Sequence, residues 1–141
     1  YDSWYQTGPN IHRSVGVLLF ILMLARLLWR HFDGRPKELP QHKPWERLAA
    51  HWTHITLFVL LFSVMLSGYL ISTADGRAVA IFGWFSIPAT LSGIDGQEDS
   101  AGVIHLSLAS ILIGLALMHD GAALKHHFID RDRTLKRMLG K

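Results

Sequence analysis

Three long apolar segments, separated by polar stretches, dominate the pattern of this chain. Residues 48–74 contain no Asp, Glu, Lys or Arg over 27 positions, and residues 101–118 contain none over 18. Residues 14–25 are also free of charge, and the apolar character continues past Arg26 to Trp29. Because about 20 apolar residues in a helix span the hydrocarbon core of a bilayer, this pattern predicts three membrane-spanning helices.

Glycine, proline and aspartate signals indicate where these helices end. A Gly-Pro pair at 8–9 suits a helix start, an Asp-Gly-Arg-Pro sequence at 33–36 ends the first helix, and Asp-Gly at 75–76 ends the second. The expected helices are at about residues 10–31, 45–73 and 100–130. We therefore predict an all-α fold, a transmembrane helical bundle, forming a single domain over residues 1–141.

Composition narrows the classes of protein that fit this pattern. Charged residues make up 18% of the 141 residues, below the quarter that is usual in soluble domains. A chain this short cannot wrap three apolar helices in a soluble shell. It contains no Cys, which excludes disulfides, iron–sulfur clusters, thiolate-ligated haem and covalently attached haem c. Nothing in the pattern indicates nucleic-acid binding.

The distribution of Lys and Arg predicts the orientation in the membrane. Eleven of these residues lie between the first two helices or after residue 118, whereas only Arg13 and Arg77 lie at the opposite ends of the helices. By the positive-inside rule, the connection at 30–47 and the C-terminus face the cytoplasm. Residues 1–9 and 75–100 then face outward.

Histidines inside the apolar segments are the candidate chemistry, because ionisable groups in a membrane are costly and usually functional. His105 and His119 lie fourteen residues apart. At about 100° and ~1.5 Å per residue, they share one helix face ~21 Å apart. His12 lies just inside the outer end of the first helix, at a depth similar to that of His105. We expect this pair to ligate a haem iron from both sides; the alternative is two interfacial histidines bonded to water or headgroups.

A second site is expected at the cytoplasmic end of the bundle. His119 lies there, and His51 and His54 enter the second helix from that end. One of these two ligates the iron opposite His119, or the ligand comes from a helix outside this chain; the spacing does not decide. Arg26 lies fourteen residues past His12 on the same helix face, at the depth of His119, so it pairs with a haem propionate or extends to the inner headgroups.

The inner end of the third helix offers a different chemistry. His126 and Arg131 flank Asp130, and a histidine beside a carboxylate supplies the hydrogen-bond donor and the proton that a quinone headgroup needs. The pattern alone favours a solvated basic anchor. Two glycines, Gly16 and Gly114, lie near the histidines, where they permit close approach of a macrocycle or a neighbouring helix.

Several segments resemble the bacterial cytochrome b561 family across the whole chain. These are IHRSVG at 11–16, LAAHWTH at 48–54, IHL at 104–106 and LMH at 117–119. GYLISTADG at 68–76 and HHFID at 126–130 resemble its branch related to a periplasmic lipocalin-like partner. The resemblance implies a four-helix protein of the bacterial inner membrane with two b-type haems and a quinone site at the inner end of the last helix.

The resemblance also implies roles for individual residues. It assigns His12 and His105 to the outer haem, and His119 to the inner haem together with a histidine of the family's first helix. That helix is missing here, so we expect an N-terminally truncated chain with three spans of four. The resemblance also favours His126 and Arg131 as residues of the quinone site.

These features together predict a transmembrane one-electron carrier that links a periplasmic donor or acceptor to the membrane quinone pool. If the protein is an enzyme, the expected class is a quinone-linked oxidoreductase. Imidazole on both sides of the iron leaves no open position for oxygen. Some members of the resembled family oxidise superoxide with ubiquinone as acceptor. The outer segments here hold five acidic residues against two arginines, a formal charge of −3, which disfavours an anionic donor. A periplasmic redox or lipid-binding protein fits better.

Three other functions remain open at this point. The chain is also compatible with an integral cytochrome b subunit of a larger respiratory complex or with a haem-free membrane anchor. A transition-metal transporter fits less well, since the apolar segments contain no carboxylate for a cation path. The bilayer and a quinone are the expected partners, and a homodimer is an assembly that the pattern leaves open.

Overall fold

The structure, a computed structural model, describes residues 2–33 and 43–131. Its long elements are the helices α1 (Trp4–Asp33), α2 (Pro44–Thr73) and α3 (Gln97–Phe128). Between α2 and α3 lies an antiparallel hairpin of β1 (Val79–Ile81) and β2 (Phe85–Ile87). Each of the three helices is long and apolar enough to cross a membrane. The predicted fold class is therefore confirmed, with the short hairpin as an addition.

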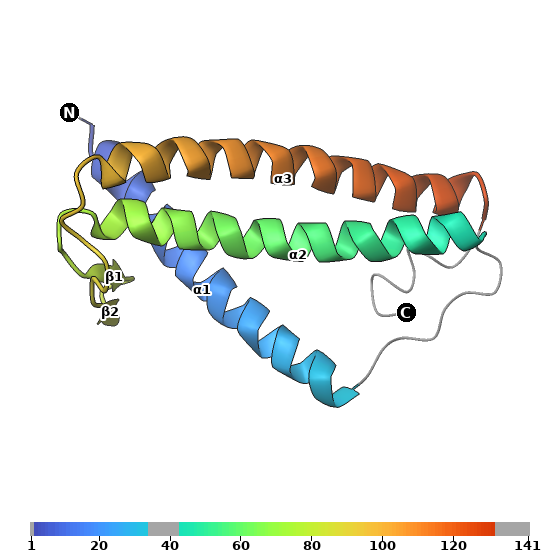
Figure 1. Ribbon diagram of the computed structural model, residues 1–141, viewed down its shortest axis with the longest axis horizontal. Coiled ribbons are helices and arrows are strands. Elements are labelled where there is room, and N and C mark those ends of the chain that lie inside the picture. The colour runs from blue at the N-terminus through green and yellow to red at the C-terminus, as the bar shows by residue number, and fades with distance from the viewer. Residues whose placement is uncertain (1, 34–42, 132–141) are drawn as a thin grey trace.

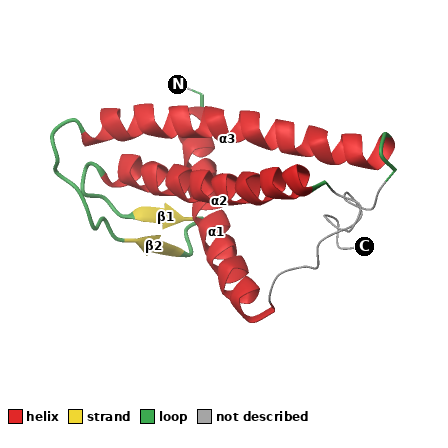
Figure 2. Ribbon diagram, turned by 45° about the vertical axis from the view of Figure 1, so that its right-hand side comes forward, coloured by secondary structure: helices red, strands yellow, loops and turns green. Residues whose placement is uncertain are grey.

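The helices are arranged as a close pair and a diverging third member. α2 and α3 run antiparallel and lie side by side along their length (Figures 1 and 2). α1 crosses them near its N-terminal half, where it packs against α2 and β1, and then diverges toward its C-terminal end (Figure 1). A ring contact between Phe20 and Phe62, with centroids 5.2 Å apart, joins α1 to α2.

The surface of the helices is the reverse of that of a soluble protein. Large apolar side chains such as Leu22 (63% exposed) and Leu117 (68%) point outward, while the buried helical side chains are small or polar. Ala101 and Ala123 of α3 are among these buried residues. Small residues let helix backbones approach closely in lipid, where no hydrophobic force drives helices together. The described part of the chain is therefore shaped as a multi-pass membrane protein.

The helix ends differ from the expected ones chiefly in α1. It begins at Trp4 rather than near residue 10, and Pro9 lies inside it instead of at its start. A proline removes one backbone donor, and the loss is tolerated near a helix N-terminus, where few such bonds have formed. α2 begins with a capping box, in which the backbone N–H of Lys43 donates to Glu46 at 2.8 Å. The sequence also predicts a short amphipathic tail at residues 133–139, which lies outside the described residues.

The outer connection between α2 and α3 has more structure than the sequence pattern predicted. Phe82 and Gly83 both have positive φ, 49° and 74°, and the N–H of Trp84 donates to the carbonyl of Ile81 at 2.9 Å. Because Ile81 pairs with Phe85, residues 82–84 form a three-residue hairpin connection, the length at which left-handed backbone is common. The side chain of Ile81 is fully buried, so the hairpin packs on the helices and is not a free loop.

Side chains of all three helices bond this outer connection to the bundle. Ser14 of α1 accepts a hydrogen bond from the N–H of Phe82 at 3.1 Å. The Tyr69 hydroxyl of α2 donates to the carbonyl of Pro88 at 2.7 Å, and Gln97 of α3 donates to the carbonyl of Leu91 at 3.2 Å. Gln97 also lies 3.0 Å from the carbonyl of Leu70, which joins α3 to α2. These bonds hold the outer ends of the helices at fixed separations.

Candidate functional site

The outer histidines of α1 and α3 meet across the bundle. The ring centroids of His12 and His105 lie 6.1 Å apart, and the ring planes are inclined by 84°. His12 comes from the segment of α1 that packs near α2, and His105 comes from the outer third of α3. The structure therefore brings together the two residues that sequence depth alone had paired.

The separation of these rings suits a metal ion held between them. A metal–imidazole bond is about 2 Å long and a ring nitrogen lies roughly 1 Å from its centroid, so two rings gripping one ion in line have centroids about 6 Å apart. The observed 6.1 Å matches that requirement. The near-perpendicular ring planes are compatible with ligation from opposite faces of a macrocycle, so His12 and His105 fit a bis-histidine haem.

The second nitrogen of His105 is already engaged. Its Nδ1 atom lies 2.9 Å from the carbonyl oxygen of Val64 and 3.1 Å from the hydroxyl of Ser67, both on α2. Because a carbonyl oxygen only accepts, we assign the proton of the neutral ring to Nδ1, which donates to Val64. The lone pair of Nε2 is then available for a metal ion.

The inner histidines form a second, tighter pair. The ring centroids of His54 and His119 lie 5.1 Å apart with planes inclined by 74°. The His51 ring instead lies against Trp52, at 6.0 Å. Of the two candidates on α2, the structure thus places His54 beside His119. Their spacing is shorter than the roughly 6 Å of in-line ligation, so the two rings are in edge contact with each other.

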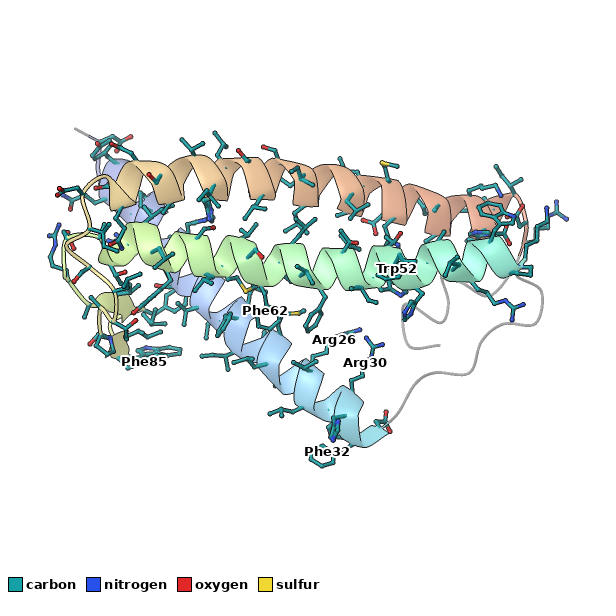
Figure 3. The ribbon with its side chains drawn as sticks, in the orientation of Figure 1. Arg26, Arg30, Phe32, Trp52, Phe62 and Phe85 are labelled. Carbon is teal, nitrogen blue, oxygen red and sulfur yellow. The ribbon has the colours of Figure 1, made fainter. Side chains whose placement is uncertain are left out.

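Two arginines of α1 face this inner pair. Arg26 and Arg30 both point from α1 toward α2 (Figure 3), and the charges of both act on the His54 ring. The structure therefore places Arg26 where an anionic group near His54 would meet it.

The inner end of α3 carries a compact polar cluster. Nδ1 of His126 lies 2.8 Å from a carboxylate oxygen of Asp130, and Nζ of Lys125 lies 2.9 Å from the same oxygen. The hydrogen bond from Lys125 lowers the pKa of the Asp130 carboxyl, so this group is ionised at neutral pH. The structure describes no polar contact of Arg131 with this cluster.

A pocket of about 520 Å³ lies at the outer end, between α1, the end of α2 and the hairpin. Both outer arginines line it, Arg13 from α1 and Arg77 from the start of the connection. Nε of Arg77 donates to Asp75 at 2.6 Å, a bond that lowers the pKa of Asp75 and raises that of Arg77. Sequence reasoning missed this grouping because 64 residues separate the two arginines.

The structure separates the two roles expected of the glycines near the histidines. A methyl group added at Gly16 or Gly114 would meet no protein atom within 4 Å, so packing on a neighbouring helix is wrong there, while room for a macrocycle stays a prediction. Gly68 of α2, which sequence reasoning did not single out, lies directly against the His105 ring. In residues 2–33 and 43–131, no three His, Asp or Glu side chains gather around a common point. Four histidines of this part of the chain meet in two pairs, His12 with His105 and His54 with His119.

Comparisons with known proteins identify the family of the chain. The chain matches the family described as Prokaryotic cytochrome b561 over residues 1–141. It is 51% identical to cytochrome b561 homolog 2 of Escherichia coli K12, over all of this chain and 75% of that protein. It is 30% identical to cytochrome b561 homolog 1 of the same organism, over 98% of this chain and 78% of that protein. It is 29% identical to a probable superoxide oxidase, CybB, of Yersinia pestis, over all of this chain and 78% of that protein.

The sequence, the fold and the family match point to the same class of protein. The described residues form three helices that are long and apolar enough to span a membrane, with histidine pairs at both ends of the bundle, and the chain matches the family over residues 1–141. The family implies a b-type haem as cofactor, which the spacing of His12 and His105 suits. The chain belongs to the prokaryotic cytochrome b561 family, as a multi-pass membrane cytochrome.

Proposed function

We propose that the protein is a transmembrane one-electron carrier that connects a redox partner on its outer face with quinone in the bacterial inner membrane. The observation that carries this proposal is the 6.1 Å spacing of His12 and His105 with Nδ1 of His105 already bonded. When bound, b-type haem supplies reversible one-electron chemistry at a potential that the protein tunes. The positive-inside pattern supports an orientation with the C-terminus in the cytoplasm.

At the outer site, His12 of α1 and His105 of α3 would hold the haem. With imidazole nitrogens as its two protein ligands, the haem would supply one-electron transfer rather than oxygen binding. The bond from Nδ1 to Val64 keeps the His105 ring in the tautomer that a ligand requires.

At the inner site, we assign His119 as a ligand of a second haem. The resemblance to the family implies that the opposite ligand is a histidine of another helix. The 5.1 Å edge contact supports a role for His54 beside this haem rather than on its iron. Arg26 then supplies a positive charge for a haem carboxylate at the same depth.

For the quinone, we propose a site at the cytoplasmic end of α3. An ionised Asp130 accepts from Nδ1 of the His126 ring at 2.8 Å, which orients the ring; when the ring carries both protons, its Nε2–H group can donate to a quinone carbonyl and pass on that proton. Arg131 follows in the chain and adds a positive charge next to this cluster. Ubiquinone is the class of acceptor that we propose.

The outer donor has two candidates. A periplasmic redox or lipid-binding protein remains the first, given the −3 charge of the outer segments. The pocket lined by Arg13, Arg77 and Asp75 supports a second candidate, superoxide. Asp75 pairs with Arg77, so Arg13 supplies the net positive charge that would steer a small anion on an otherwise acidic face. Each superoxide ion gives up one electron to become dioxygen, and two electrons with two protons reduce one quinone to quinol.

The donor candidates are separated by stopped-flow reduction of the purified protein. If superoxide is the donor, Arg13→Gln lowers the second-order rate of reduction by superoxide, and added salt lowers the wild-type rate. A rate that responds to neither change leaves the protein partner as the donor. Co-purification of a stoichiometric respiratory partner would instead favour a subunit of a larger complex.

Haem content tests the proposed ligation directly. The variants His12→Ala and His105→Ala are expected to lose the outer haem, measured by the reduced-minus-oxidised spectrum per mole of protein. His31→Ala is the matched control, since His31 lies at the far end of α1 and its ring contacts only Phe32 among the ring contacts described. Full haem content in His105→Ala contradicts the proposal. His54→Ala is expected to keep the inner haem. Loss of the inner haem in this variant would show that His54 is a ligand.

A further inference from the structure

We propose that Ser67 and Gly68 of α2 form a socket that sets the orientation and donor strength of His105 as a haem ligand. The two residues are thus positioning residues for electron transfer. The socket consists of the Val64 carbonyl, the Ser67 hydroxyl and the Cα face of Gly68. This inference rests on the proposed ligation by His105 and assigns residues that act through it.

The Ser67 hydroxyl, the Val64 carbonyl and the Nδ1 atom of His105 all lie within hydrogen-bond distance of one another. Oγ of Ser67 lies 2.9 Å from the Val64 carbonyl and 3.1 Å from Nδ1 of His105, while Nδ1 lies 2.9 Å from that same carbonyl. With its proton donated to Val64, the hydroxyl accepts from the Nδ1–H group, which is shared between two oxygens. Ser67 is 5% exposed, so water does not replace it as an acceptor.

Other serines on these helices behave differently. Ser63 and Ser72 of α2, and Ser107 and Ser110 of α3, each donate to the carbonyl four residues earlier. Ser67 donates to the carbonyl three residues earlier, which is the one that also accepts from His105. Its rotamer is therefore directed toward the ligand, whereas those of the other serines serve only their own helix.

Gly68 completes the socket by leaving room for the ring. A methyl group at this position would lie 3.1 Å from Cε1 and 3.3 Å from Nδ1 of His105, closer than the 3.5–4.0 Å of ordinary carbon contacts. The other described glycines within the helices, at 8, 16, 102, 114 and 121, have nothing within 4 Å. The helical glycine that contacts a side chain is therefore the one beneath the proposed haem ligand.

The chemical consequence follows from the coupling between a ligand and its own hydrogen bonds. Acceptors on the distal N–H of a metal-bound imidazole fix its tautomer and raise its basicity. A more basic ligand stabilises ferric over ferrous iron and lowers the reduction potential. Removing the Ser67 oxygen while leaving Val64 in place is therefore expected to raise the potential of the outer haem without removing it.

The test is a spectroscopic redox titration of the full chain in detergent. Ser67→Ala is expected to shift the midpoint potential of the outer haem upward at unchanged haem content. Ser63→Ala, which loses only an intrahelical bond on the same helix, is expected to leave the potential unchanged. If Ser67→Ala fails to fold, Ser67→Thr and Ser67→Val are compared instead. These two variants have side chains of the same shape and differ in the hydroxyl, so Ser67→Thr is expected to give the lower midpoint potential.

The role of Gly68 is tested separately, by the spin state of the haem iron. Gly68→Ala is expected to tilt the His105 ring and to convert part of the low-spin signal in electron paramagnetic resonance to high spin, whereas Gly121→Ala on α3 leaves it unchanged. Equal potentials in the Ser67 and Ser63 variants, with an unaltered signal in Gly68→Ala, would overturn the socket. His105→Ala decides separately on the ligation, since its retention of haem would overturn the proposed function itself.

Discussion

Replacing Ser14 by Ala probes how the diverging helix is held at its functional end. α1 leaves the α2–α3 pair beyond its outer half, so the placement of His12 depends on contacts near that residue (Figure 1). The Ser14 hydroxyl, 2% exposed, accepts from the N–H of Phe82 in the hairpin turn. Phe82 is a non-glycine residue with a φ of 49°, a conformation that surrounding contacts must stabilise.

The size of the effect follows from the loss of this acceptor. Phe82 is 44% exposed, so water can reach its freed N–H group and the cost is the net worth of one hydrogen bond, about 0.5–1.5 kcal/mol. At about 1.4 kcal/mol per tenfold, that cost converts to roughly a 2–12-fold change in an opening equilibrium. We expect Ser14→Ala to open the hairpin more often by this factor, and to lower outer-haem content because His12 loses its fixed position opposite His105.

Hydrogen exchange measured by mass spectrometry gives the assay, with peptides that cover residues 79–87. Ser110→Ala is the control, because Ser110 is exposed and donates only to the carbonyl of Leu106 within α3. Exchange in the hairpin is expected to accelerate in Ser14→Ala and to stay unchanged in the control. Equal exchange in both variants, together with wild-type haem content, would refute the role of Ser14 in holding α1.

Two further predictions concern the two faces of the protein. Tyr69→Phe removes a hydroxyl that accepts from the N–H of Thr90 at 2.9 Å, so exchange of that amide should accelerate, while an unchanged rate would mean that the outer connection is held otherwise. Lys125 lowers the pKa of Asp130 below its ordinary 3.8, so the stabilising carboxylate is fully present above that pH and is lost as the pH falls through the lowered value. Infrared spectra should therefore show an ionised Asp130 bonded to His126 at pH 5, and a protonated carboxyl there would contradict this.

The membrane-spanning character was readable from the sequence because it depends on local properties. Length and apolar content of a segment decide whether it spans a bilayer, and neither needs knowledge of its neighbours. The depth of a histidine in a helix follows from residue number alone. This is why His12 and His105 could be placed at one depth, and His119, His51 and His54 at another, whereas the residue opposite His119 was left open.

Other features depended on the relative placement of segments, which only the tertiary structure decided. The choice of His54 over His51, and the contact of Gly68 with His105, depend on the rotation of α2 about its axis against α3. Arg13 and Arg77 share a pocket because the hairpin folds back onto α1. Such contacts are set by packing between residues far apart in sequence, and no local pattern encodes the angle at which two helices meet.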